Sequence, residues 1–173
     1  MQPGRDPVTG DLPPGLGHIV ERFDHVAIAA ERIEDVLPLV ELVGGRFRNG
    51  GDNDAGGFRW IQFFLPGAGK VEVIAPLPAA GDDNFLVEFL HRRGPGVHHL
   101  TFKVGDLDAA VEAARDSGFE VVGYDAATYP GWKEAFLHPK STGGTLIQLT
   151  EFVDRPPPDV SVADVLTGIP ESD

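Results

Sequence analysis

Apolar and polar residues alternate over two stretches of the chain, Phe23–Ala30 and Val97–Val104. A period of two predicts β-strands with one buried face. Other predicted strands are short apolar or alternating runs bounded by Pro, Gly or polar residues: Phe58–Pro66, Val71–Pro76, Lys133–Pro139 and Leu146–Phe152. Two helices are predicted where the apolar residues follow a helical spacing and the stretch ends at a glycine. They are Glu34–Val43 before Gly44 and Leu107–Ser117 before Gly118.

These elements occur twice in the same order. His25 and His99 are 74 residues apart, and Glu72 and Gln148 are 76 residues apart. A repeat at a nearly constant offset indicates two copies of one supersecondary unit. The sequence therefore predicts an α+β fold in which two βαβββ modules form one curved, mixed sheet. We place the modules at about residues 22–78 and 96–152 of a single domain, residues 19–152.

Both ends of the chain differ from this middle part. Residues 1–18 are polar and rich in Pro and Gly. We expect a flexible leader there, because such a segment buries too little apolar surface to offset the entropy of ordering. Residues 153–173 are predicted to form a tail, in which the proline run favours an extended segment and Ser161–Leu166 forms one helical turn.

Strand phase places several polar residues on one side of the predicted sheet. Successive side chains of a strand point to opposite faces. His99 is therefore expected on the concave face, together with Thr101 and Lys103. His98 is expected on the opposite face, beneath the helices, where every second residue is apolar. By the same alternation, His25 is expected on the concave face of its own strand.

Glu72 and Gln148 each interrupt an apolar strand near its centre, and with His25 and His99 they allow two interpretations. Each residue could be a half-buried polar group with an ordinary hydrogen-bond partner. The matched positions in the two halves favour convergence on one site at the axis of the repeat. Two imidazoles, a carboxylate and an amide oxygen suit a divalent cation and leave room for water or substrate. We therefore predict a metal centre.

Composition narrows the choice of metal and partner. The 173 residues include no cysteine, so only nitrogen and oxygen ligands remain, which suit Co, Zn, Mn, Ni or Fe. The formal net charge of -13 argues against nucleic acid and anionic membranes as partners, since both require a basic surface. No apolar run approaches 18 residues and no signal-like segment is visible, so we expect a cytoplasmic protein.

Four sequence segments, HVAIA, VEVIAPL, GPGVHHLTFKV and FLHPKSTGGTLIQL, resemble methylmalonyl-CoA epimerases of the vicinal oxygen chelate superfamily. That superfamily also includes glyoxalase I, extradiol dioxygenases and bleomycin-resistance proteins. The resemblance runs from about Phe23 to Phe152. It implies a glyoxalase-like fold around one divalent metal ion held by His25, Glu72, His99 and Gln148. It also implies a small-molecule substrate, an acyl-CoA in the epimerases, and a homodimer.

The chain differs from the epimerases at the position of Gln148, where they usually carry Glu. Its carboxylate stands instead at Glu72, which we predict to be the catalytic base. A second acidic residue, which some epimerases carry on the preceding strand, is replaced by Ile61, with the neutral Gln62 beside it. We predict Gln62 and Lys140 as substrate-binding residues, the latter through a phosphate or carboxylate of an acyl-CoA.

The leading functional hypothesis is a metal-dependent epimerase or isomerase that stabilises an enolate of a small acyl-CoA or α-oxygenated carbonyl compound. One alternative is an Fe(II) dioxygenase, since two His and one carboxylate form its usual ligand set, or a glyoxalase-like lyase. Another is a non-catalytic protein that binds a small, antibiotic-like molecule. The complete set of four polar positions argues against the last of these.

Overall fold

The computed structural model describes residues 15–67, 69–156 and 158–168. These residues form one sheet with the strand order β2-β3-β4-β1-β5-β8-β7-β6. The strands are β1 (Val20–Ala29), β2 (Arg46–Asn53), β3 (Phe58–Phe64), β4 (Lys70–Pro76), β5 (Gly96–Val104), β6 (Val121–Asp125), β7 (Trp132–Leu137) and β8 (Leu146–Phe152).

The strand order repeats itself about the centre of the sheet. β1 and β5 pair antiparallel in the middle, and each pairs on its other side with a parallel strand, β4 or β8. The outer pairs are antiparallel. This is the predicted α+β arrangement of two βαβββ modules in one mixed sheet, and the fold class is confirmed.

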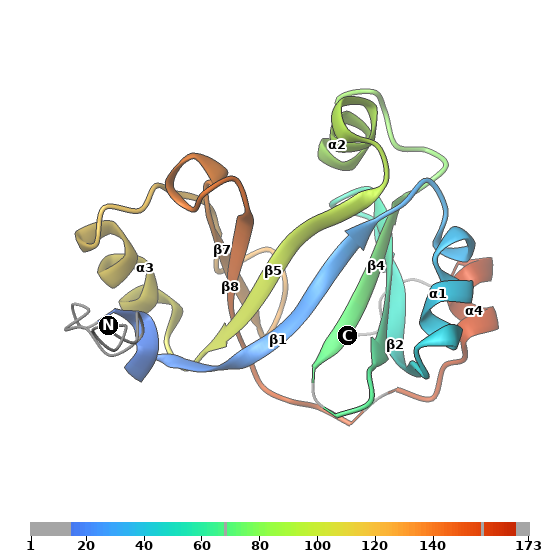
Figure 1. Cartoon of the computed structure of the whole chain (residues 1–173), viewed down its shortest axis with the longest axis horizontal. Helices are drawn as coiled ribbons and strands as arrows, with labels where there is room; N and C mark the ends of the chain where they lie inside the picture. Colours follow the sequence, from blue (N-terminus) through green and yellow to red (C-terminus); the bar gives the residue numbers. More distant parts are fainter. Residues whose placement is uncertain (1–14, 68, 157, 169–173) are drawn as a thin grey trace, which may run out of the picture.

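The helices of the described residues are α1 (Leu37–Leu42), α2 (Phe85–Arg93), α3 (Leu107–Asp116) and α4 (Val162–Thr167), with short 3-10 turns η1 (Leu16–His18), η2 (Ile33–Asp35) and η3 (Pro139–Ser141). Figure 1 shows α1 and α4 side by side against the first module and α3 against the second. α2 lies at one end of the central strands. The opposite, concave face of the sheet lines a cavity.

Two predicted helices have different outcomes. The helix predicted over Leu107–Ser117 is confirmed within a residue at its end, and the Asp106 side chain caps it by accepting a hydrogen bond from the backbone N–H of Ala109. The helix predicted over Glu34–Val43 is wrong in extent. It divides into η2 and the six-residue α1, and Pro38 lies in the first turn of α1. Proline is tolerated only at the beginning of a helix.

Three elements were not predicted, namely β2, β6 and α2. β2 has the sequence RFRNGGDN, and its glycines and asparagines are rare in strands. β6 is a five-residue edge strand that pairs with β7 alone. Only Leu86 and Leu90 of α2 are buried, which is too few for a clear helical period.

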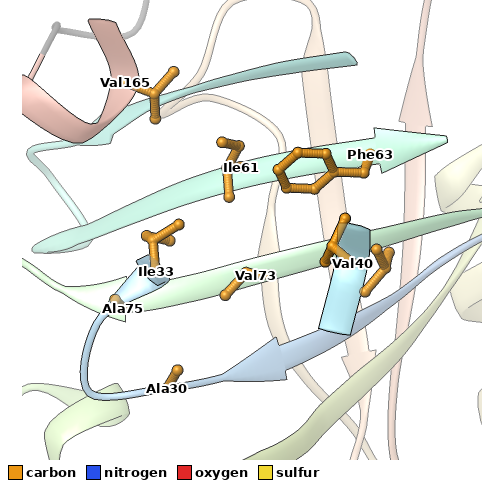
Figure 2. Packing of buried hydrophobic residues seen from close by; sticks show 9 residues of the cluster. Ala30, Ile33, Val40, Ile61, Phe63, Val73, Ala75 and Val165 are labelled. Carbon is orange, nitrogen blue, oxygen red and sulfur yellow. The ribbon is translucent and has the colours of Figure 1, made fainter. Parts of the chain in front are cut away.

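The C-terminal segment returns to the first module instead of ending beside the second. α4 begins with a capping box between Ser161 and Asp164, close to the predicted turn at Ser161–Leu166. Its Val165 is fully buried and lies against Ile61 and the core of the first module (Figure 2). At the other end, residues 1–14 of the predicted leader lie outside the described residues, whereas Leu16 packs against the core of the second module.

No helix within residues 15–67, 69–156 and 158–168 is long and apolar enough to cross a membrane.

We expect Val165→Ala to lower the free energy of unfolding by about 2 kcal/mol, because it removes two buried methyl groups and leaves a cavity between α4 and the sheet. Val153→Ala is the matched control, since Val153 lies in the same segment but is 78% exposed. Urea unfolding of both variants measures the difference. Equal effects of the two substitutions would show that α4 does not stabilise the domain.

A cluster of charged side chains also stabilises the start of this segment. Asp154 accepts two hydrogen bonds from the Arg22 guanidinium, at 2.9 and 2.7 Å, and one from Lys103 Nζ at 3.1 Å. The hydrogen bonds from Arg22 lower the pKa of Asp154 to about 2. A carboxyl whose pKa is lower in the folded than in the unfolded chain stabilises the fold above its unfolded pKa.

Asp154→Asn should therefore lower the free energy of unfolding by up to about 1 kcal/mol at neutral pH, the upper value for a solvent-exposed ion pair. The difference from the unsubstituted protein should shrink as the pH falls from about 4, the ordinary pKa of Asp, towards 2. Asp159→Asn, also exposed and in the same segment, should have no such effect. A destabilisation that does not change with pH would contradict the ionic role of Asp154.

Candidate metal centre

A cavity of about 1880 Å³ occupies the concave face of the sheet and takes side chains from both modules. Its polar lining near the centre consists of His25, Gln62, Glu72, His98, His99, Glu134 and Gln148. All four predicted ligands and Gln62 are therefore in one cavity. Lys140 is exposed in η3 and is not among the lining residues, so its contact with substrate stays a prediction.

Two adjacent rows of paired residues across the four central strands set the positions of the predicted ligands. One row runs Glu72–Ala27–His99–Leu146, and the other runs Lys70–His25–Thr101–Gln148. The small Ala27 is fully buried between Glu72 and His99. Turning the sheet about the axis between β1 and β5 exchanges the two histidines, and exchanges Glu72 with Gln148.

The side chains of His25, Glu72 and His99 converge. Each offers one ligand atom, and these three atoms lie within 4.8 Å of one another. His25 Nε2 is 3.6 Å from Glu72 Oε1 and 3.0 Å from Thr101 Oγ1. His99 Nε2 is buried and makes no hydrogen bond within the described residues. An unpaired buried nitrogen on a ring that converges with a carboxylate and a second imidazole fits a divalent cation.

Gln148, the fourth predicted ligand, is linked to His25 through the hydroxyl of Thr101. Thr101 Oγ1 donates a 2.6 Å hydrogen bond to Gln148 Oε1, and the same hydroxyl contacts His25 Nε2. Thr101 occupies the place that Ala27 has in the other module. Thr101 lies on the face that its strand phase predicts, and its link between Gln148 and His25 was not predicted.

Burial and neighbouring charges shift the pKa values of the central groups in different directions. Burial opposes ionisation of Glu72, but the facing His25 outweighs it and lowers the pKa of Glu72 to about 2. Burial likewise opposes protonation of His25, yet Glu72 and then Asp24 raise the pKa of His25 to about 9. Burial lowers the pKa of His99 to about 3. His99 therefore keeps a lone pair over the whole physiological pH range.

Asp24 supports His25 and was missed by the sequence analysis. Its buried carboxylate accepts a 2.8 Å hydrogen bond from His25 Nδ1 and forms ion pairs with Lys70 at 2.7 Å and Arg22 at 2.9 Å. Although burial opposes ionisation, His25 and Lys70 hold the pKa of Asp24 well below its usual range. A carboxylate on one ring nitrogen directs the other nitrogen towards the site.

Each module also holds a glutamine–glutamate pair. Gln62 Nε2 donates to Glu72 Oε2 at 2.7 Å, and Gln148 Nε2 donates to Glu134 Oε2 at 2.7 Å. In the first module the carboxylate is on the inner strand β4, whereas in the second it is on the outer strand β7. Trp132 Nε1 also donates to Glu134, and burial raises the pKa of Glu134.

Glu134 was missed although a signal existed. The alternation in β7 buries Ala135 and Leu137 in the core, so Glu134 and Phe136 must face the other side of the sheet. That side is the cavity.

The predicted orientation of His98 is wrong. In the pairing of β1 with β5, Ala27 pairs with His99 and Ile28 with Val97, which leaves His98 as the extra residue of a β-bulge. A bulge locally breaks the alternation of side chains. His98 consequently lines the cavity beside His99, with 2.8 Å between the two Nδ1 atoms.

Known proteins are similar to this chain in sequence, and one of the solved structures is similar to it in fold. The chain is 30% identical over 133 residues to uncharacterized protein YqjC of Bacillus subtilis, covering 76% of this chain and 93% of that protein. It is 28% identical over 144 residues to an ethylmalonyl-CoA/methylmalonyl-CoA epimerase of Cereibacter sphaeroides, covering 77% of this chain and 99% of that protein. The crystal structure of methylmalonyl-CoA epimerase from Mycobacterium tuberculosis superposes with a TM-score of 0.68 at 30% identity, covering 83% of this chain and 93% of that one.

A family model spans three of the four predicted ligands. It is described as the glyoxalase/bleomycin resistance protein/dioxygenase superfamily and matches residues 24–136, a span that includes His25, Glu72 and His99. The chain therefore belongs to the glyoxalase/bleomycin resistance protein/dioxygenase superfamily.

Proposed function

We propose that this protein is a metal-dependent epimerase that inverts the carbon next to the thioester carbonyl of a small acyl-CoA, of the methylmalonyl-CoA type. One observation carries the proposal. Two carboxylates, Glu72 on β4 and Glu134 on β7, line one cavity from opposite sides of the central β1–β5 pair, with the His25–Glu72–His99 cluster in it. The named epimerases that this chain resembles support the choice of substrate class.

The ion would be held by His25, Glu72 and His99, with Gln148 as the fourth ligand through Oε1. Bound there, a Co, Zn, Mn, Ni or Fe ion supplies a Lewis acid that stabilises negative charge on the carbonyl oxygen of the substrate. Asp24 holds His25 in the required orientation through its 2.8 Å hydrogen bond.

Inversion of a carbon requires that a proton leaves one face and another arrives at the opposite face, which ordinarily takes two groups. Gln148 cannot exchange a proton near neutral pH. We assign Glu72 to one face and Glu134 to the other. As the C–H bond breaks, its proton passes to one carboxylate and its electron pair moves towards the carbonyl oxygen. The other group, which starts as the carboxylic acid, then gives its proton to the opposite face of the carbon, and the electron pair returns from the oxygen side to form the new C–H bond.

The hydrogen bonds around these carboxylates support the assignment. Gln62 holds Glu72, whereas Gln148 and Trp132 hold Glu134. These amide and indole donors hold each carboxylate without competing for its proton. Gln62, predicted as a substrate-binding residue, acts in this proposal through Glu72.

One observation favours a second candidate. His25, His99 and Glu72 form a set of two histidines and one carboxylate, which is the ligand set of Fe(II) dioxygenases. The identity of the bound metal and the fate of the substrate α-proton separate the two candidates.

We expect the full chain, purified without chelators, to hold close to one divalent ion per chain in elemental analysis. His99→Ala should reduce that occupancy strongly, because it removes a buried nitrogen that the described residues leave unpaired. His91→Ala, at an exposed position of α2, is the matched control. A chain that takes up no divalent ion, even after reconstitution with each candidate metal, would refute the metal-dependent epimerase.

Methylmalonyl-CoA incubated with the protein in heavy water should acquire deuterium at the α-carbon, whichever epimer is supplied. Glu72→Gln and Glu134→Gln should each lower the rate of epimerisation by roughly 100-fold or more, the usual effect of losing a positioned acid–base group. Glu134→Gln keeps Glu72 and the other proposed ligands, so this variant should still exchange the proton of one epimer. Mass spectrometry of the separated epimers measures this.

Two controls accompany the exchange experiment. Glu112→Gln, at an exposed position of α3, should leave the rate unchanged. The double variant Glu134→Gln/Gln148→Glu moves the carboxylate to the inner strand and should recover part of the activity lost by Glu134→Gln. Absence of deuterium in the product of the unsubstituted protein would exclude the proposed reaction, and full activity of Glu134→Gln would exclude Glu134 as the second base.

A further inference from the structure

We propose that His98 is a positioning residue that fixes the ring of His99, so that Nε2 of His99 faces the metal cluster, and that α2 holds His98 in place for this purpose. The inference rests on the metal centre of the proposed function. It goes beyond that function by giving a role to the first histidine of the pair and to a helix that contributes no predicted ligand.

The two modules show the same local device. In β1, Phe23 pairs with Phe102 and His25 with Thr101, so Asp24 is the extra residue of a bulge, just as His98 is in β5. Each bulge turns the residue before a histidine towards the same side as that histidine. Asp24 Oδ2 is 2.8 Å from Nδ1 of His25, and His98 Nδ1 is 2.8 Å from Nδ1 of His99.

Hydrogen-bond chemistry decides the direction of the bond between His98 and His99. Of two nitrogens in contact, one must donate a proton and the other must accept it. If His98 donated, a neutral His99 would carry its proton on Nε2, a buried atom that makes no hydrogen bond with the described residues. The consistent arrangement has His99 Nδ1–H donating to His98. It leaves the lone pair on Nε2, which can then bind the ion proposed to be held with Glu72 and His25.

α2 fixes the position of His98. The ring of Phe89 lies edge to face against the His98 ring, with centroids 4.7 Å apart, and that of Phe85 lies 5.7 Å away. The ring of Phe85 in turn packs against that of Phe58 in β3, with 5.6 Å between the ring centroids. The helix is anchored at its beginning by Asn84, which caps it and donates to the carbonyl oxygen of Gly56. A first-module turn and α2 are thus linked through His98 to a ligand of the second module.

Three variants separate the hydrogen bond of His98 from its packing. His98→Phe keeps a ring of similar size between Phe85 and Phe89 and removes the accepting nitrogen. His98→Asn gives up the ring and places an amide oxygen near the former Nδ1. His91→Phe, at an exposed position of α2, controls for the introduction of phenylalanine.

The measurement is Co²⁺ affinity of the full-length protein, by competition with a coloured chelator, together with the visible spectrum of bound Co²⁺. We expect His98→Phe to weaken Co²⁺ binding about 10- to 100-fold, as loss of a group that orients a metal ligand does, and to shift the Co²⁺ bands. His98→Asn should restore most of the affinity, which a purely structural role would not predict. His91→Phe should bind like the unsubstituted protein.

Unchanged affinity and spectrum in His98→Phe would overturn the inference and leave the proposed function intact. If the unsubstituted protein binds no Co²⁺, both fall. An independent measurement covers the case in which His98→Phe does not fold. Two-bond ¹H–¹⁵N correlation spectra of the unsubstituted, metal-free protein should show His99 protonated at Nδ1, and protonation at Nε2 would refute the proposed positioning.

Discussion

The antiparallel pairing of β1 with β5 is the constraint on which the candidate site depends. It sets the two cross-strand rows that carry the four predicted ligands, and it places fully buried Ala27 between Glu72 and His99. A shift of one residue in this register would turn one strand's side chains to the opposite face. α1, α3 and α4 pack against the outer face, whereas α2 packs at one end of the central strands and lines part of the cavity on the concave face.

Strand phase and the internal repeat were sufficient to predict that His25, Glu72, His99 and Gln148 line one cavity, because side-chain direction follows sequence position wherever pairing is regular. The same reasoning failed at His98 and passed over Asp24, since each is the extra residue of a bulge. A bulge is defined by two strands that lie far apart in the sequence. Nothing in a single strand's pattern reveals it.

The unpredicted elements have a similar physical explanation. β2 is rich in Gly and Asn, and the pairing with β3 holds it in the sheet. α2 buries only Leu86 and Leu90, which pack against Ala27, Ala29 and Ile74 of the central strands. Such elements are stabilised by tertiary contacts more than by their own propensity. Because α2 holds His98, a part of the site that depends on long-range packing was also beyond the sequence analysis.

Gln148 stands where the epimerases that this chain resembles usually carry Glu, and in the proposed function Glu134 takes the role of the second carboxylate. Two carboxylates among the ligands of one buried site repel each other and raise each other's pKa. In the second module Gln148 is on the inner strand and Glu134 on the outer strand, so the second carboxylate is one strand farther from Glu72 than a Glu at position 148 would be. A 2.7 Å hydrogen bond from Gln148 still connects Glu134 to the site. Each module thus has one carboxylate hydrogen-bonded to one amide, but the positions are not equivalent, because Gln62 pairs directly with Glu72 whereas Gln148 pairs with Phe136 and Glu134 with Thr150. The chemistry of two acid–base groups can therefore be kept while the charge next to the ion is reduced.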